Sequence, residues 1–165
     1  LLVTIISVLA TDQVSKLLVN RSLSLGESWP QDGIFRITYT TNTGTAFGLF
    51  PGQTLALTIA SLFAIGFLLY VYRTQASRIR ILRIAIGLQL GGAFGNLLDR
   101  VRQGTVVDFF DVGWWPVFNV ADSSIVVGMA ILVVVLILGV GREPLADTSK
   151  GSEEESARAQ EDTRG

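Results

Sequence analysis

Hydrophobic residues gather in four long runs along the chain, and polar segments separate these runs. The runs cover approximately residues 1–19, 54–72, 81–98 and 120–140. A helix needs about 20 mostly apolar residues to cross the hydrocarbon core of a bilayer. The pattern therefore predicts a polytopic α-helical membrane protein with four transmembrane helices.

A different periodicity appears after the first run. Side chains in FRITYT, residues 35–40, alternate between apolar and polar, and most of these residue types favour strands. Asn42 and Gly44 follow directly and favour a turn. We therefore expect a small β-sheet or hairpin over residues 34–50, on the extracytoplasmic side of the membrane.

The third run carries a packing signal. Gly87, Gly91 and Gly95 recur every four residues and so share one face of a helix. Small residues at this spacing allow the backbones of two membrane helices to approach closely. The glycines predict a close helix–helix contact and need no catalytic explanation.

Positive charge in the loops predicts the orientation of the helices. Residues 73–83, which link the second run to the start of the third, contain no acidic residue and carry four arginines, Arg73, Arg78, Arg80 and Arg83. Lys and Arg concentrate in cytoplasmic loops, so this loop and both chain termini are expected in the cytoplasm. Residues 20–52 and 99–119 are then extracytoplasmic, although Arg100 and Arg102 oppose this orientation.

The C-terminal segment differs from the rest of the chain in composition. Residues 142–165 contain 11 charged residues among 24 and are rich in Ser, Glu and Ala. Such a segment cannot bury enough apolar surface to fold by itself. We expect a membrane-embedded domain at residues 1–141 and a disordered cytoplasmic tail at residues 142–165.

Composition also narrows the chemistry that the chain can perform. Its 165 residues include no Cys and no His, and its net charge is −1. Thiol nucleophiles, histidine-based triads and the usual zinc sites are excluded, and no metal or cofactor is expected. The charge gives no reason to expect a nucleic-acid partner. Catalysis would have to use Asp, Glu, Ser, Thr, Lys or Tyr.

Ionisable side chains occur inside or next to the apolar runs, where they are functional candidates by default. Asp12 and Lys16 are four residues apart in the first run, a spacing that suits an ion pair, either structural or part of a site. Asp122 opens the fourth run, where it could also act only as a helix-capping acid. Further polar residues at the same membrane face are Asn96, Asp99, Arg100, Asp108 and Asn119.

Two carboxyl groups in a poorly hydrated site suit peptide hydrolysis. They cannot both ionise easily, so one keeps its proton while the other is ionised. The ionised group can take a proton from an attacking water, and the protonated group can donate one to the leaving amine. This chemistry alone leaves open which aspartates form the pair.

Five short motifs follow one another along the chain: DQVSK (residues 12–16), NTGTAFG (42–48), GGAFGNLLDR (91–100), VVDFF (106–110) and FNVAD (118–122). In this order, and with four membrane-spanning segments, the chain resembles the lipoprotein signal peptidase family, also called signal peptidase II. The resemblance covers roughly residues 1–141. It implies four transmembrane helices and a small extracytoplasmic β-element, in the cytoplasmic membrane of a bacterium.

The resemblance also implies a function. Such a protein is an intramembrane aspartyl endopeptidase that removes the signal peptide from diacylglyceryl-modified prolipoproteins, cutting just before the lipidated cysteine. Its partners would be these precursors and membrane lipid. Asp108 and Asp122 match the catalytic pair, near the outer face of the membrane, and Asp111 matches no functional position. The substrate-binding or supporting positions match Asp12, Lys16, Asn42, Gly44, Asn96, Arg100 and Asn119.

Two other classes of membrane protein are alternatives. A small transporter or channel would carry charges along a pathway near the membrane midplane, with broken or repeated helices. Here the charges gather at one face, and the second run has none. A structural or chaperone-like membrane protein would need no paired carboxylates. Cleavage of a lipid-modified precursor by the purified protein would distinguish the protease from both.

Overall fold

Four long helices and a small sheet make up the part of the chain that the computed structural model describes, residues 1–44, 53–76 and 79–138. The helices are α1 (Leu2–Ser22), α2 (Thr54–Val71), α3 (Arg80–Gln103) and α4 (Val120–Leu138), and a π-helix, η2 (Tyr72–Ala76), continues α2. All four are long and apolar enough to cross a bilayer, which confirms the predicted number of such helices. Residues 139–140 of the predicted fourth span and the predicted tail at 142–165 lie outside the described residues.

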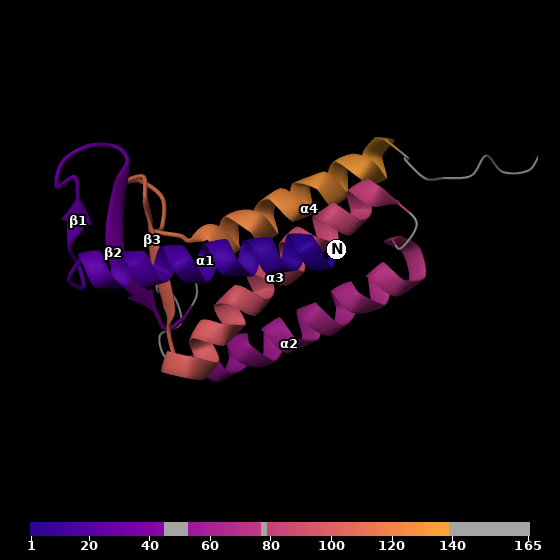
Figure 1. The fold of residues 1–165 in the computed structure, drawn as a ribbon, viewed down its shortest axis with the longest axis horizontal. Coiled ribbons are helices and arrows are strands. Elements are labelled where there is room, and N and C mark those ends of the chain that lie inside the picture. The colour runs from indigo at the N-terminus through magenta and orange to yellow at the C-terminus, as the bar shows by residue number, and fades with distance from the viewer. Residues whose placement is uncertain (45–52, 77–78, 139–165) are drawn as a thin grey trace, which may run out of the picture.

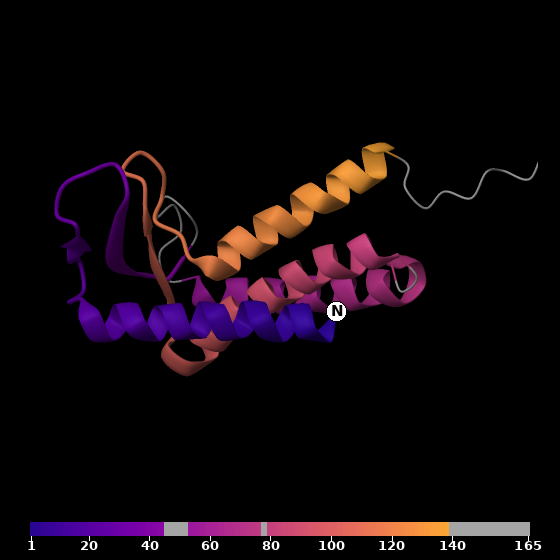
Figure 2. The same ribbon diagram turned by 45° about the horizontal axis from the view of Figure 1, so that its top comes forward.

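Helix α3 is the centre of the bundle, and α1, α2 and α4 all pack against it (Figures 1 and 2). More than half of its most apolar stretch is buried, against less than a quarter for each other helix. Ile86 and Leu90 of α3 are fully buried in this core. The other helices expose large apolar side chains such as Phe63 and Val126, as expected of surfaces that contact lipid.

The glycine face of α3 lies directly against α1. A Cβ atom added at Gly91 would come within 2.7 Å of Val8 Cβ, closer than real Cβ atoms are found. Gly87 is similarly close to α1. The predicted close helix contact is thus confirmed. It brings the Asp12 carboxylate, one turn beyond Val8, against Gly95.

Helix α3 is longer than the hydropathy pattern indicates. The sequence predicts an extracytoplasmic segment at residues 99–119, but the helix continues through Asp99 and Arg100 to Gln103. Gly104 ends it in the left-handed conformation, with a φ of 75°. Arginines in the last turn also favour helix there, because positive charge stabilises a helix C-terminus. The hydropathy pattern misses this boundary because a hydrophobic run stops at the first charged residues, whereas a helix can continue through them.

A three-stranded antiparallel sheet covers one end of the bundle, opposite the end at which α3 begins (Figure 1). Its strands are β1 (Ser28–Trp29), β2 (Arg36–Asn42) and β3 (Val106–Asp111), in the order β1-β2-β3. The predicted sheet is confirmed, but the longer pairing joins β2 to the distant β3. A turn follows β2, where Gly44 N donates to Asn42 Oδ1 at 2.9 Å. Residues 45–50 of the predicted segment lie outside the described residues.

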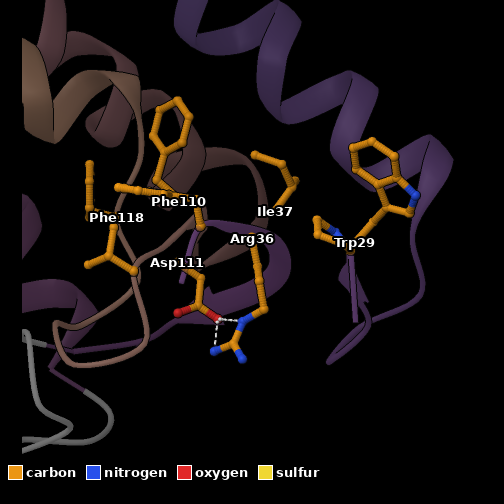
Figure 3. A pocket seen from close by; sticks show the side chains of 9 residues that line it. Trp29, Arg36, Ile37, Phe110, Asp111 and Phe118 are labelled. Carbon is orange, nitrogen blue, oxygen red and sulfur yellow. Dashed lines mark hydrogen bonds and ion pairs between the residues drawn. The ribbon is translucent and has the colours of Figure 1, made fainter. Parts of the chain in front are cut away.

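An ion pair joins the ends of β2 and β3. Arg36 and Asp111 are partners in the register of the two strands. Arg36 donates to Asp111 Oδ2 from Nε and Nη2, at 3.1 and 2.8 Å (Figure 3). Thr38 Oγ1 and Gly113 N also donate to this carboxylate. Burial alone would raise the pKa of Asp111, but the hydrogen bonds and the guanidinium charge lower it below its ordinary value.

We expect Gly91→Ala to destabilise the protein, because the added methyl group would collide with Val8 across the contact between α1 and α3. Overpacking of this kind costs about 1–3 kcal/mol. Thermal unfolding in detergent, followed by circular dichroism, measures the loss. Gly66→Ala on α2 is the matched control, since a Cβ atom there meets nothing within 4 Å. Equal melting temperatures for the two variants would contradict the close contact.

We expect Asp111→Asn to lower stability at neutral pH by about 1–3 kcal/mol, because an NH₂ group replaces one carboxylate oxygen among donors and the charge that pairs with Arg36 is lost. A carboxylate whose pKa is lowered by folding stabilises the folded state above its unfolded pKa. This contribution is lost as the pH falls through the folded pKa. The difference in melting temperature between wild type and variant should therefore begin to shrink near pH 4, the ordinary pKa of an aspartate, and disappear only below the lowered pKa of folded Asp111. A difference that persists undiminished in acid would rule out the ion pair as its cause.

Candidate active site

Strand β3 places Asp108 in the interior, where the sheet meets the helices. The residue is 3% exposed and has apolar neighbours on both sides along the strand. Asn119 Nδ2 donates to Asp108 Oδ1 at 2.6 Å. Burial raises the pKa of Asp108 to about 7, and the negative charge of Asp122 adds to the rise. Hydrogen bonds from Asn119 and Asn42 oppose this rise without cancelling it. Asp108 can therefore hold a proton near neutral pH.

The first turn of α4 carries Asp122. Asn119 precedes the helix, and its Oδ1 accepts from Asp122 N at 2.9 Å while Asp122 Oδ2 accepts from Asn119 N at 3.3 Å. This reciprocal arrangement is a capping box. Asp122 Oδ1 also accepts from Asn96 Nδ2 at 2.8 Å. Asp122 is thus a capping acid, as one interpretation of the sequence held, and it is also part of a polar cluster that reaches α3.

Asn119 links the two aspartates. It is fully buried, and it contacts Asp108 through its amide nitrogen and Asp122 through its amide oxygen and backbone nitrogen. The same amide nitrogen lies 3.2 Å from Asn96 Oδ1 and 3.2 Å from Val107 O. Both carboxyl groups are therefore hydrogen-bonded to one fully buried asparagine.

Lys16 lies behind this pair, buried between two further carboxylates. Its Nζ is 2.8 Å from Asp12 Oδ2, 2.8 Å from Asp99 Oδ2 and 3.0 Å from Asn96 Oδ1. The predicted ion pair of Asp12 and Lys16 is confirmed, but Asp99 shares the lysine equally. Asn96 also donates to Asp122, so the side chain of Asn96 connects Lys16 to one of the two aspartates.

The remaining predicted site residues border the same cluster. Arg100, in the last turn of α3, is half-buried and interacts electrostatically with Asp122 and Asp108. Asn42, at the end of β2, hydrogen-bonds to Asp108, and its side chain also fixes the backbone of the buried Gly44. The structure therefore brings all of the predicted site residues together at the sheet end of the bundle.

Asp99 and Gln13 also belong to the cluster, although neither is among the predicted site residues. Gln13 Nε2 donates to Asp99 Oδ1 at 2.9 Å and to Asp12 Oδ2 at 3.2 Å. Val107 N donates to Asp99 Oδ2 at 3.3 Å. The sequence does carry a signal for Asp99, which follows Asn96 by three residues and so shares a face of α3 with it. Gln13 gives no comparable signal.

A cavity of about 510 Å³ lies against the sheet (Figure 3). Its lining is mostly apolar and includes Trp29, Ile37, Phe110 and Phe118. Figure 3 shows Phe110 and Ile37 on one side of the strands, with the paired Arg36 and Asp111 turned to the other. Neither Asp108 nor Asp122 lines this cavity. The two carboxyl groups of the polar cluster are therefore not part of this cavity.

The cluster contains the groups that acid–base chemistry requires. Asp108 can hold a proton near neutral pH, and Asp122 is a second carboxyl group fixed beside it by amide donors. Two carboxyl groups whose environments differ in this way can act as acid and base on one bond. Within residues 1–44, 53–76 and 79–138, no group of three or more Asp or Glu side chains could hold a metal ion.

Comparisons with known proteins point to one family. Residues 4–138 match the family model described as signal peptidase (SPase) II. The lipoprotein signal peptidase of Halothermothrix orenii is 43% identical over 136 residues, which cover 81% of this chain and 92% of the relative. The lipoprotein signal peptidase of Rhodococcus jostii is 46% identical over 154 residues, which cover 88% of this chain and 75% of the relative.

Two solved structures of bacterial membrane enzymes are similar in fold. One, determined by the in meso method at 2.3 Å resolution, has a TM-score of 0.80 and 28% identity, covering 88% of this chain and 92% of that one. Another, determined by the same method at 1.9 Å, has a TM-score of 0.75 and 30% identity, covering 89% and 93%. The shared fold and the sequence match over residues 4–138 show that the chain belongs to the signal peptidase II family.

Proposed function

We propose that this protein is an intramembrane aspartyl endopeptidase that removes the signal peptide from bacterial prolipoproteins, with Asp108 and Asp122 as its catalytic pair. The family consists of signal peptidases, and the relatives described above are named lipoprotein signal peptidases. The observation that carries the mechanism is the bridge through Asn119, which fixes two carboxyl groups in one site.

In the proposed reaction, Asp108 begins protonated and Asp122 begins ionised. Asp122 takes a proton from a bound water while the water oxygen attacks the carbonyl carbon of the scissile peptide bond. Asp108 hydrogen-bonds to the carbonyl oxygen. When the carbon–nitrogen bond breaks, the leaving nitrogen receives a proton from the pair, and a carboxylic acid and an amine result. The raised pKa of Asp108 supports this division of roles, because it keeps that group protonated near neutral pH.

The neighbouring polar residues would hold the pair and the substrate. Asn96 and Asn119 donate amide hydrogens to the carboxyl groups and add no charge, so the shared proton stays with the aspartates. Arg100 brings positive charge next to the pair from the end of α3. We propose that Arg100, Asn42 and Gly44 face the substrate, since they border Asp108 from the helix and from the sheet.

We propose that the site faces the extracytoplasmic side and that both termini face the cytoplasm. Arg73 in η2 and the arginines that begin α3 lie at the end of the bundle away from the sheet (Figure 1). Positive charge concentrates on the cytoplasmic side, which supports placing the sheet and the polar cluster outside. Residues 1–141 would then form the membrane-embedded peptidase domain, and residues 142–165 a cytoplasmic tail.

The proposed substrate is a precursor whose cysteine carries a diacylglyceryl group, and the proposed cut lies just before that cysteine. Each buried CH₂ contributes about 0.8 kcal/mol, so two acyl chains would hold the cysteine at the level of the membrane interface. The polar cluster includes the last part of α3 and the first turn of α4, which supports placing it near that level. Binding of the acyl chains could thus position the scissile bond without contact to the reacting atoms.

We expect Asp108→Asn and Asp122→Asn each to reduce cleavage of a diacylglyceryl-modified precursor by about 100- to 10,000-fold. Asparagine keeps the shape of the side chain but cannot exchange the proton. Mass spectrometry of the signal peptide released by the purified protein measures the rate. Asp111→Asn removes a carboxylate from the same strand and should retain most activity below its melting temperature. Substantial activity in either of the first two variants would exclude this catalytic pair.

We expect an unmodified precursor to be cleaved with a kcat/KM lower by about 100-fold or more, because it lacks the binding energy of the acyl chains. The comparison uses lipidated and unlipidated forms of one precursor, both anchored in the same vesicles by the same signal-peptide helix. Anchoring both forms equalises their concentration in the membrane. Equal rates for the two forms would show that the acyl chains do not contribute to catalysis. The protein would then be a general membrane peptidase.

A further inference from the structure

We infer that Asp99 is a positioning residue for Asp108, and that Lys16 couples it to Asp12, which positions Asp122 in the same way. This inference rests on the proposed function, because it assigns the two outer carboxylates a role relative to the proposed catalytic pair. Each outer carboxylate holds the backbone N–H of the residue directly before one catalytic aspartate.

Asp12 fixes the start of α4. The N–H of Ala121 donates to Asp12 Oδ1 at 3.0 Å, and Ala121 directly precedes Asp122. Backbone N–H groups in the first turn of a helix have no partner within the helix, so a carboxylate from α1 satisfies one of them. Both Asp12 and Ala121 are 0% exposed, so water cannot replace this hydrogen bond. The direction in which Asp122 leaves the helix is therefore tied to α1.

Asp99 fixes the start of β3 in an equivalent way. The N–H of Val107 donates to Asp99 Oδ2 at 3.3 Å, and Val107 directly precedes Asp108. Both Asp99 and Val107 are buried. The carboxylate comes from the last part of α3, and it holds the strand close to the helix end. The direction in which Asp108 leaves the strand is therefore tied to α3.

Lys16 and Gln13 join the two carboxylates to each other. Lys16 Nζ lies 2.8 Å from Asp12 Oδ2 and 2.8 Å from Asp99 Oδ2. Gln13 Nε2 donates to the same two side chains, at 3.2 and 2.9 Å. A displacement of either carboxylate therefore moves or unpairs the donors of the other. The two backbone contacts form one unit, built from α1 and α3, that sets the separation of the proposed catalytic groups.

A unit of this kind acts on the rate of the chemical step. A misplacement of a reacting group by about 1 Å can cost about 100-fold in rate without weakening substrate binding. A purely structural ion cluster would instead change only the melting temperature. The two roles therefore differ in kcat, measured at a temperature where the variant is folded.

The first test is Asp99→Asn. Asparagine has a single acceptor oxygen, which cannot serve Gln13, Lys16 and Val107 together as the carboxylate does. We expect kcat for the diacylglyceryl-modified precursor to fall by about 100-fold, while KM changes little. Asp111→Asn is the matched control, because it also removes a buried, ion-paired carboxylate but does not hold the backbone before a catalytic aspartate. It should lose stability and keep its kcat.

The second test uses Gln13→Leu and decides the question even when Asp99→Asn fails to fold. This variant removes the donor that joins the two carboxylates but leaves both ion pairs of Lys16 in place. We expect a smaller fall in kcat, of about 10-fold, again with little change in KM. An unchanged kcat in folded Asp99→Asn, or in Gln13→Leu when the first variant does not fold, would overturn the positioning role. Failure of the wild type to cleave the precursor at all would instead overturn the proposed function.

Discussion

The burial of one lysine between two carboxylates is the constraint on which the packing of the bundle depends. Removing each ion from water costs several kcal/mol, and only close and well-oriented partners compensate for this cost. Lys16 reaches both partners only if α1 and α3 lie close together, and the glycine face of α3 permits that approach. The close contact of α1 with α3 and the ion cluster therefore depend on each other. Gly91 and Gly95 have no side chains, and this leaves room for α1 and for the Asp12 carboxylate.

The helices could be predicted from the sequence because a bilayer imposes one simple requirement, a long apolar segment, at every crossing. The ends of the helices and the pairing of the strands do not follow from that requirement. α3 runs on to Gln103 because its backbone hydrogen bonds continue after its side chains become charged. β2 shows strand periodicity, but its main partner, β3, lies far along the chain. Local patterns carry no information about such a pairing.

The motifs in the sequence predicted most of the residues of the candidate site. They did not predict the hydrogen bonds and ion pairs that join these residues. Asp108, Asp122 and the asparagines lie together as the family resemblance implies, and their catalytic and supporting roles remain proposals. The sequence marks Asp99 as a polar candidate but does not predict its burial, because a charged residue beside Arg100 at the end of a helix usually faces water. Its burial follows from Lys16, which approaches from another helix with three N–H donors, more than the Asp12 carboxylate alone satisfies.

The residues of the cluster come from different helices, so they are synthesised at different times. α1 is synthesised first and carries Asp12 and Lys16 one turn apart, so its two charges can enter the membrane already paired within a single helix. Asp99 arrives only with α3, and Asp122 only with α4, the last of the four helices. Until α4 is made, the chain lacks Asp122 and holds no carboxyl pair. The pair can form only after α4 has packed against α3 and α1.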